Sequence, residues 1–304
     1  MAERESPPTG LSKHLLVTVS NDVEHLYGVQ FICSFFRAMS AFQVTLFHIC
    51  RLDAPDMKAE LLKMWEGPSD GVHGRLSVGA RRSLDCAVRM LGDRQMRVGQ
   101  MITKTVDERC GKVRDILAEG SRGLYDAVVL GRRASYTLQW LVERPAEETP
   151  LALIRDHRFT VPLWICPKVE SNRRGVLLGL DDSPDALRTA DHVGYILADQ
   201  AHQPITLLQV TSVPGNGGVA EIFERAAGVL HRHGIGDERI QRRTVWGLSV
   251  AGTILGEADK SGAAVVAVGL GGSGSTAGAG FRFSGGTTAR LIAKNETVSL
   301  WCTP

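Results

Sequence analysis

The stretch Ala264-Val-Val-Ala-Val-Gly269-Leu-Gly-Gly272-Ser-Gly-Ser-Thr-Ala-Gly-Ala-Gly280 decides which fold we expect for this chain. It begins as a short apolar run, which is typical of a strand buried on both faces. A glycine-dense segment follows, and the pair Gly286-Thr287 then opens the last helical pattern. Glycine lets backbone N–H groups approach a ligand closely, and N–H groups at a helix N-terminus bind anions. The stretch therefore predicts a strand, a phosphate loop and a helix, although a plain linker has a similar composition.

Short apolar strands recur in the two halves of the chain, in the same order. Residues 14–20 match 175–181, 44–49 match 205–210, 127–131 match 265–269, and 162–166 match 299–302. The separation between matching segments shortens along the chain, which places about 23 extra residues between the second and fourth strands of the first half. Four matches in one order indicate an internal duplication.

Helical patterns fill the gaps between these strands. Ser183-Pro184-Asp185 is typical of a helix start, with a serine cap, a proline at the first helical position and an acid in the first turn. Strands that alternate with helices predict a doubly wound α/β fold, used twice. We expect domains at 13–168 and 174–304, joined by a linker, and we interpret residues 52–110 as helix plus loop.

The composition excludes several classes of protein. The chain has 304 residues and a formal net charge of +2, without a basic stripe with interleaved aromatic residues, so we expect no nucleic-acid partner. No apolar run approaches the roughly 18 residues that span a bilayer, so we expect no membrane insertion. Six cysteines lie far apart without a C-x-x-C pair, which predicts free thiols in a reducing, cytoplasmic compartment and no zinc site.

Three features at the expected strand ends resemble one known family. Asp181 ends the first strand of the second half, Gly269-x-x-Gly272 follows the fourth strand, and Gly286-Thr287 precedes the last helix. On these residues the chain resembles the universal stress protein family, as a tandem pair from about residue 13 to 304. The resemblance implies two five-stranded parallel-sheet domains of the adenine nucleotide alpha hydrolase-like, Rossmann-like type. It also implies ATP with Mg²⁺, because many members of that family bind ATP.

Carried over position by position, the resemblance implies a site in the second half made of Asp181, Val210, Gly269, Gly271, Gly272, Gly286, Thr287 and Thr288. Asp181 would hold the ribose or adenine end, and the Val210 backbone would contact the adenine. The loop glycines would lie against ribose and phosphates, and the residues from Gly286 to Thr288 would bind the phosphates. Such a site fits the crevice that the carboxyl ends of parallel strands form.

This sequence departs from the family pattern in its loop. Thirteen residues separate Gly272 from Gly286, where the family has nine. The same residues also have plainer interpretations, because Asp181 can be a helix-flanking acid and Thr287 with Thr288 can be an ordinary helix start.

The first half departs further from the pattern. Ser20 stands in the aspartate position, Ala134 replaces the second loop glycine, and bulky residues fill 132–144. No Gly-Ser or Gly-Thr pair follows. We therefore expect that this half binds no nucleotide and serves as a packing partner.

Rival functions find less support in the sequence. Gly269-x-Gly271-x-x-Gly274 also satisfies the dinucleotide fingerprint of an NAD-dependent oxidoreductase, but that motif belongs after the first strand of its fold. His231-x-His233 has near-ligand spacing, yet residues two apart on a helix point in different directions. No general base is evident, so we expect no enzyme beyond slow ATP hydrolysis.

Two functional classes remain open. The first is a stress-response regulatory protein whose second half binds ATP and presents a nucleotide-dependent surface to an unknown protein partner. The second is a nucleotide-free interaction scaffold whose glycine loop is a connector. We expect the apolar runs at 162–166 and 298–302 to be edge strands, whose unpaired backbone groups need a partner strand. They can pair within one chain, as an intramolecular pseudo-dimer, or between chains, as a homodimer.

Overall fold

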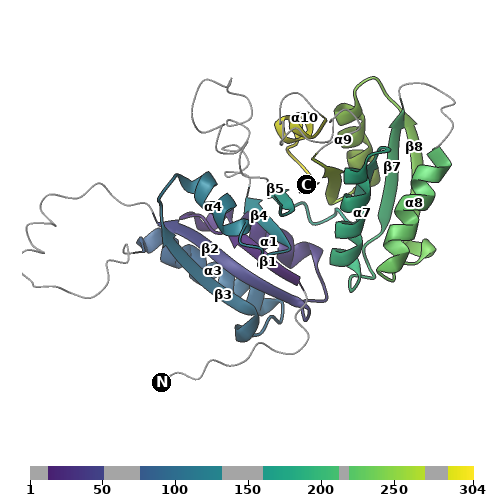
Figure 1. The fold of residues 1–304 in the computed structure, drawn as a ribbon. Helices are drawn as coiled ribbons and strands as arrows, with labels where there is room; N and C mark the ends of the chain where they lie inside the picture. Colours follow the sequence, from purple (N-terminus) through teal and green to yellow (C-terminus); the bar gives the residue numbers. More distant parts are fainter. Residues whose placement is uncertain (1–12, 51–75, 132–159, 212–218, 271–286) are drawn as a thin grey trace, which may run out of the picture.

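One mixed sheet of ten strands organises the molecule (Figure 1). The computed structural model describes residues 13–50, 76–131, 160–211, 219–270 and 287–304. The strands are β1 Lys13–Thr18, β2 Phe42–Cys50, β3 Met101–Asp107, β4 Ala127–Gly131, β5 Leu163–Cys166, β6 Val176–Leu180, β7 Ile205–Thr211, β8 Ile240–Trp246, β9 Val265–Gly269 and β10 Ser299–Thr303. The helices are α1 Tyr27–Phe35, α3 Val78–Asp93, α4 Lys112–Gly120, α7 Pro184–Leu197, α8 Val219–Arg232, α9 Val250–Ser261 and α10 Thr287–Lys294, with the short 3-10 helices η1 Val23–His25, η2 Val98–Gln100 and η3 Asp237–Arg239.

The strand order is β3-β2-β1-β4-β5-β10-β9-β6-β7-β8. Read outward from the centre, both halves of the sheet have the same order of fifth, fourth, first, second and third strand. All neighbours pair in parallel except β5 and β10, which pair antiparallel with Trp301 opposite Trp164. The predicted doubly wound α/β class is confirmed, and the helix start at Ser183 is confirmed by its cap on the Ala186 N–H.

The third strand of each half was not predicted. β3 lies in the region that we interpreted as helix plus loop, where α3 supplies the helix, and residues 51–75 lie outside the described residues. β3 and β8 form the two edges of the sheet, and most of their side chains are exposed or only partly buried. An edge strand needs no continuous apolar run, so the signal that identified the inner strands is absent from both.

Two apolar layers cover the two faces of the sheet. One layer packs against α1, α3, α7 and α8, and the other packs against α4, α9 and α10. Neighbouring strand residues alternate between the layers, with Leu15 and Val17 in the first and Leu16 in the second. Both faces of the inner strands are buried, which explains their unbroken apolar sequences.

The two halves of the sheet meet at a pair of stacked tryptophans. The ring centroids of Trp164 and Trp301 lie 4.1 Å apart at an interplanar angle of 8°, and both side chains are fully buried. The Trp164 indole N–H donates to His192 Nε2 at 3.1 Å, whereas Phe31 lies edge-on to Trp301. The apolar edges at β5 and β10 therefore cover one another within the chain.

Polar contacts also join the two halves. Gln200 accepts from the Arg37 backbone N–H at 2.9 Å and donates to the Ala38 carbonyl at 2.7 Å. Gln203 donates to the Phe35 carbonyl at 2.7 Å. Both glutamines are buried, so these bonds satisfy amide groups that would otherwise destabilise the joint.

Two further observations bear on the composition-based expectations. All six cysteines are free thiols, and burial raises the pKa of Cys166 and of Cys302 to about 12. None of the described helices combines the length and the apolar character that a membrane crossing requires.

Candidate functional site

We call the side of the sheet where the parallel strands of the second half have their carboxyl ends its carboxyl edge. At this edge, the chain leaves β6 toward one face of the sheet and β9 toward the other, which makes a switch point. β6 pairs with β9, and the following helices α7 and α10 pack in different apolar layers. The pairing ends at Leu178 and Ala267, although β6 continues to Leu180 and β9 to Gly269. Ligands of doubly wound sheets bind at such a switch point.

Asp181 stands at this point, immediately after β6. Its carboxylate accepts from the Ser183 backbone N–H at 3.1 Å and from the Ser183 hydroxyl. Ser183 in turn caps α7 by accepting from the Ala186 N–H at 3.2 Å. The acid is partly buried, and the helix-flanking role that the sequence allowed is present. Each carboxylate oxygen accepts more than one bond, so Ser183 does not exhaust the acceptor capacity of Asp181.

Gly269 ends β9 against the first turn of α7. A Cβ at this position would lie 2.7 Å from the Asp185 Cβ and 3.1 Å from the Asp185 carbonyl carbon. In the first half a Cβ at Gly131 would meet the His25 carbonyl oxygen at 3.5 Å, which is an ordinary contact. A packing reason for glycine after the fourth strand is therefore present at Gly269, where the contact includes backbone atoms of Asp185, and not at Gly131.

Thr287 and Thr288 begin α10, as the sequence predicted. The Thr288 side chain is buried, and its hydroxyl donates to the Gly269 carbonyl at 2.8 Å. The bond fastens the N-terminus of α10 to the end of β9. The single proton of this hydroxyl is committed to Gly269, so toward a phosphate the site offers backbone N–H groups of α10 rather than the Thr288 hydroxyl.

Val210 lies one strand further along the same edge. The β6–β7 pairing ends at Leu180 and Gln209, whereas the β7–β8 pairing continues to Thr211 and Trp246. The Val210 backbone therefore extends past the end of β6, on the side where Asp181 follows that strand. Asp181, Gly269 and Val210 thus lie at the carboxyl ends of the adjacent strands β6, β9 and β7, and Thr288 joins the start of α10 to Gly269. Gly271, Gly272 and Gly286 lie outside the described residues.

The corresponding edge of the first half has different chemistry. The Ser20 hydroxyl accepts from the Asp22 N–H at 3.2 Å, and Asp22 contacts His25 Nδ1 at 2.6 Å. Ser20 stands where the second half has Asp181, so this half lacks the carboxylate at the end of its first strand. Residues 132–144, which we expected to crowd a triphosphate, lie outside the described residues.

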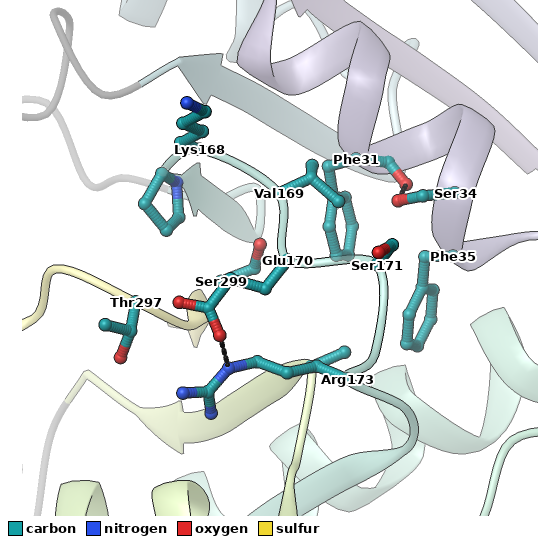
Figure 2. Close-up of a pocket in the computed structure, with 12 residues that line it drawn as sticks. Phe31, Ser34, Phe35, Lys168, Val169, Glu170, Ser171, Arg173, Thr297 and Ser299 are labelled. Carbon is teal, nitrogen blue, oxygen red and sulfur yellow. Dashed lines mark hydrogen bonds and ion pairs between the residues drawn. The ribbon is translucent and has the colours of Figure 1, made fainter.

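A hollow lies at the joint between the halves, and its lining includes none of the candidate site residues (Figure 2). Phe31 and Phe35 of α1 form one side, and the segment from Pro167 to Arg173 forms another. Arg173 Nε contacts Glu170 at 2.6 Å, and Arg173 Nη2 contacts Asp259 at 2.7 Å. The segment that we expected to be a linker is fastened to α9 by the ion pair with Asp259, and the two acids balance the charge of Arg173.

Histidines and cysteines offer no catalytic centre in the described part of the chain. His231 and His233 contact different acids, Asp237 at 3.3 Å and Asp191 at 2.8 Å, and His233 lies in the turn that follows α8 rather than on the helix. The described residues contain no cluster of metal-binding side chains. Burial also raises the pKa of Cys33 to about 11, which leaves that thiol protonated near neutral pH.

One residue at this edge was missed by the sequence interpretation. Trp246 ends β8 beside Thr211 and is 56% exposed, although tryptophan is usually largely buried. The signal that could have found it is an aromatic residue just before the Gly247-Leu248-Ser249 turn that leads into α9. It went unnoticed because the edge strand that carries it was not identified.

Comparisons with known proteins agree with this architecture. The chain is similar to a universal stress protein from Archaeoglobus fulgidus, with a TM-score of 0.60, 15% identity and 95% of each chain covered. It is also similar to a functionally unknown protein from Pseudomonas aeruginosa, with a TM-score of 0.53, 15% identity, and coverage of 98% of this chain and 94% of the other. No family model and no curated protein sequence matches the chain. At these identities the likeness establishes the fold, and we conclude that this chain has the fold of the universal stress protein structures.

Proposed function

We propose that this chain is a tandem member of the universal stress protein family whose second half binds ATP with Mg²⁺. Bound nucleotide would alter a surface that a protein partner recognises, so that the chain acts as a stress-response regulatory module. The observation that carries the proposal is the arrangement at the switch point, where Asp181 follows β6, the neighbouring strand β9 ends at Gly269, and Thr288 fastens the N-terminus of α10 to Gly269. A carboxylate suits a ribose hydroxyl, and a helix N-terminus suits phosphate.

Different residues would contact the base, the ribose and the phosphates of the nucleotide. Asp181 would accept from the ribose or the adenine end, and the Val210 backbone would contact the base. Gly269, Gly271, Gly272 and Gly286 would line the phosphate path, with Thr287 and Thr288 at the start of α10. Mg²⁺ would balance the phosphate charge.

We propose binding rather than turnover as the activity. The charged groups described at this edge have structural partners, with Asp181 bonded to Ser183 and Asp185 paired with Arg188. Hydrolysis requires a group that orients water toward the γ-phosphate, and neither acid is held for that task. ATP would be held, with at most slow hydrolysis.

The first half would serve as the packing partner of this module. Its β5 edge covers β10, so the chain forms its own pseudo-dimer and needs no second copy for that contact. The free thiols fit a reducing compartment, and we propose the cytoplasm.

A nucleotide-free interaction scaffold is the second candidate. Two observations favour it: the Thr288 hydroxyl is already committed to Gly269, and Gly269 has a packing reason of its own. On this alternative the edge of the second half is a structural join, and the glycine-rich stretch is a connector.

Nucleotide recovered from the purified full-length chain separates the two candidates. Protein purified without added nucleotide is denatured, and the released small molecules are resolved by chromatography. We expect an adenine nucleotide at close to one per chain. Protein that releases none, and whose melting temperature does not rise with Mg²⁺ and ATP, would contradict the proposal and favour the scaffold.

A further inference from the structure

An exposed apolar cluster stands at the carboxyl edge of the second half. Trp246 is 56% exposed, Leu248 is 86% exposed and Val250 is 40% exposed. All three follow or end β8, which runs beside β7 at the outer edge of this half (Figure 1). These three large apolar residues lie within five positions of the chain, and contiguous exposed apolar surface marks sites of contact on proteins.

The turn that carries this cluster is held firmly. The Gly247 N–H donates to the Thr211 carbonyl at 3.1 Å, and a Cβ at Gly247 would lie 2.0 Å from Thr253 Oγ1. Ser249 then caps α9 by accepting from the Gly252 N–H at 3.3 Å. Trp246 is thus presented from a fixed backbone, as a preorganised binding surface requires.

The middle of β8 carries ion-paired charged side chains. Arg242 pairs with Glu224 at 3.3 Å, and Arg243 pairs with Glu257 at 3.0 Å. The change from ion-paired arginines to an exposed indole occurs at the end of the strand, where the strand reaches the carboxyl edge.

The register places Trp246 next to the proposed base site. Val210 lies opposite Val245, and Thr211 lies opposite Trp246. The indole therefore stands one strand beyond the Val210 backbone, on the edge that also carries Asp181. Its flat face suits a purine ring, which stacks on aromatic side chains.

The first half provides an internal comparison. In that half Cys50 occupies the place of Thr211, and the register sets Asp107 opposite Cys50. Asp107 is thus the counterpart of Trp246. The first half therefore lacks both the carboxylate that corresponds to Asp181 and the aromatic side chain that corresponds to Trp246. The second half has both groups.

We propose that Trp246 is the stacking platform for the adenine base of the bound nucleotide. The proposal rests on the proposed function, because it assigns a residue to that same site.

Calorimetric titration of the full-length protein with Mg²⁺ and ATP tests this assignment. We expect Trp246→Ala to weaken the Kd about tenfold or more, because the stack is lost, and Trp246→Phe to retain most of the affinity. Leu248→Ser, a change at a still more exposed apolar neighbour, should leave the Kd unchanged. Inorganic tripolyphosphate, titrated directly as a ligand without a base, should bind wild type and Trp246→Ala with the same Kd. Tryptophan emission should change on ATP binding in the wild type, and Trp246→Phe should remove that change.

The outcomes separate this assignment from the proposed function. An unchanged Kd for ATP in Trp246→Ala would overturn the stacking role while nucleotide binding stands. Equal losses for ATP and tripolyphosphate would also overturn it, because a stacking residue acts on the base. Wild-type protein that binds no ATP would overturn both proposals. The melting temperature of each variant confirms that it is folded.

Discussion

At the end of β9, Gly269 packs so closely on α7 that an added Cβ would lie 2.7 Å from the Asp185 side chain. The sequence predicted this glycine as a ligand contact, because glycine lets backbone approach phosphate. The structure gives it a second role that exists without any ligand. A site residue can therefore be required by the fold and by the ligand at once, and the two requirements are separated by measuring stability in the absence of nucleotide.

Gly269→Ala should destabilise the nucleotide-free protein by roughly 1–3 kcal/mol, because the new methyl group meets backbone atoms. Gly256→Ala in α9 is the matched control, since a Cβ there meets nothing within 4 Å. A glycine in a helix interior costs roughly 0.5–1 kcal/mol relative to alanine, so this control should stabilise the protein. Urea unfolding of both variants checks the pair. Equal stability of Gly269→Ala and wild type would show that the close approach is not maintained.

The sequence predicts where the candidate residues lie along the strands, but not which bonds they form. Carboxyl ends of parallel strands share one edge, so the motif positions alone placed Asp181 and the start of α10 near each other. The bond from Thr288 to Gly269 depends on how two elements distant in sequence are packed, and no local pattern encodes it. Trp246 was missed for a related reason, because its strand lies at an edge and lacks an apolar run.

At the scale of elements, the stacked tryptophans of β5 and β10 have different neighbours, a histidine for one and a phenylalanine for the other. Trp164 donates to His192, whereas no described residue accepts from the Trp301 indole, which lies edge-on to Phe31. Burial lowers the pKa of His192 from its ordinary value of 6.5 to about 3. The folded protein thus holds this histidine neutral at a pH where the unfolded chain already binds a proton.

The sign of the resulting pH dependence follows from linkage. The contribution of neutral His192 to stability is fully present above pH 6.5 and is lost as the pH falls from 6.5 toward 3. Each pH unit in this window removes up to about 1.4 kcal/mol. His192→Phe copies the neighbour that Trp301 has, so its free energy of unfolding should fall less steeply between pH 6.5 and pH 4.5 than that of the wild type.

Phe31→His is the reciprocal variant, because it offers the Trp301 indole an acceptor and adds a second buried histidine. Its stability should fall more steeply over the same pH range. Denaturant unfolding at several pH values measures both slopes. Identical slopes in wild type and His192→Phe would contradict the role given to this histidine.

The elements themselves were predicted to different degrees. The inner strands were found because burial on both faces requires continuous apolar residues, as in β6 and β9. β3 and β8 were not found, because the edges of the sheet carry exposed and charged side chains. The intrachain pairing of β5 with β10 was one of two alternatives that the sequence left open.

At the scale of the whole molecule, one sheet joins two halves that share a strand order and differ in chemistry. Ser20, Phe31 and Asp107 in the first half correspond to Asp181, His192 and Trp246 in the second. The differences fall at the joint and at the carboxyl edge, while the apolar strands remain alike. Such a division suits a chain in which one half binds a ligand and the other half supports it.

The measurement that tests this account most directly is calorimetric titration of nucleotide-free protein with Mg²⁺ and ATP. The account predicts one site per chain, lost in Asp181→Ala. Asp182→Ala is the matched control, because it removes an adjacent carboxylate that is exposed and paired with Arg225 at 2.7 Å, and it should bind ATP as the wild type does. Two sites per chain would contradict the division between the halves. Absence of binding in the wild type, or binding that survives in Asp181→Ala, would contradict the site itself.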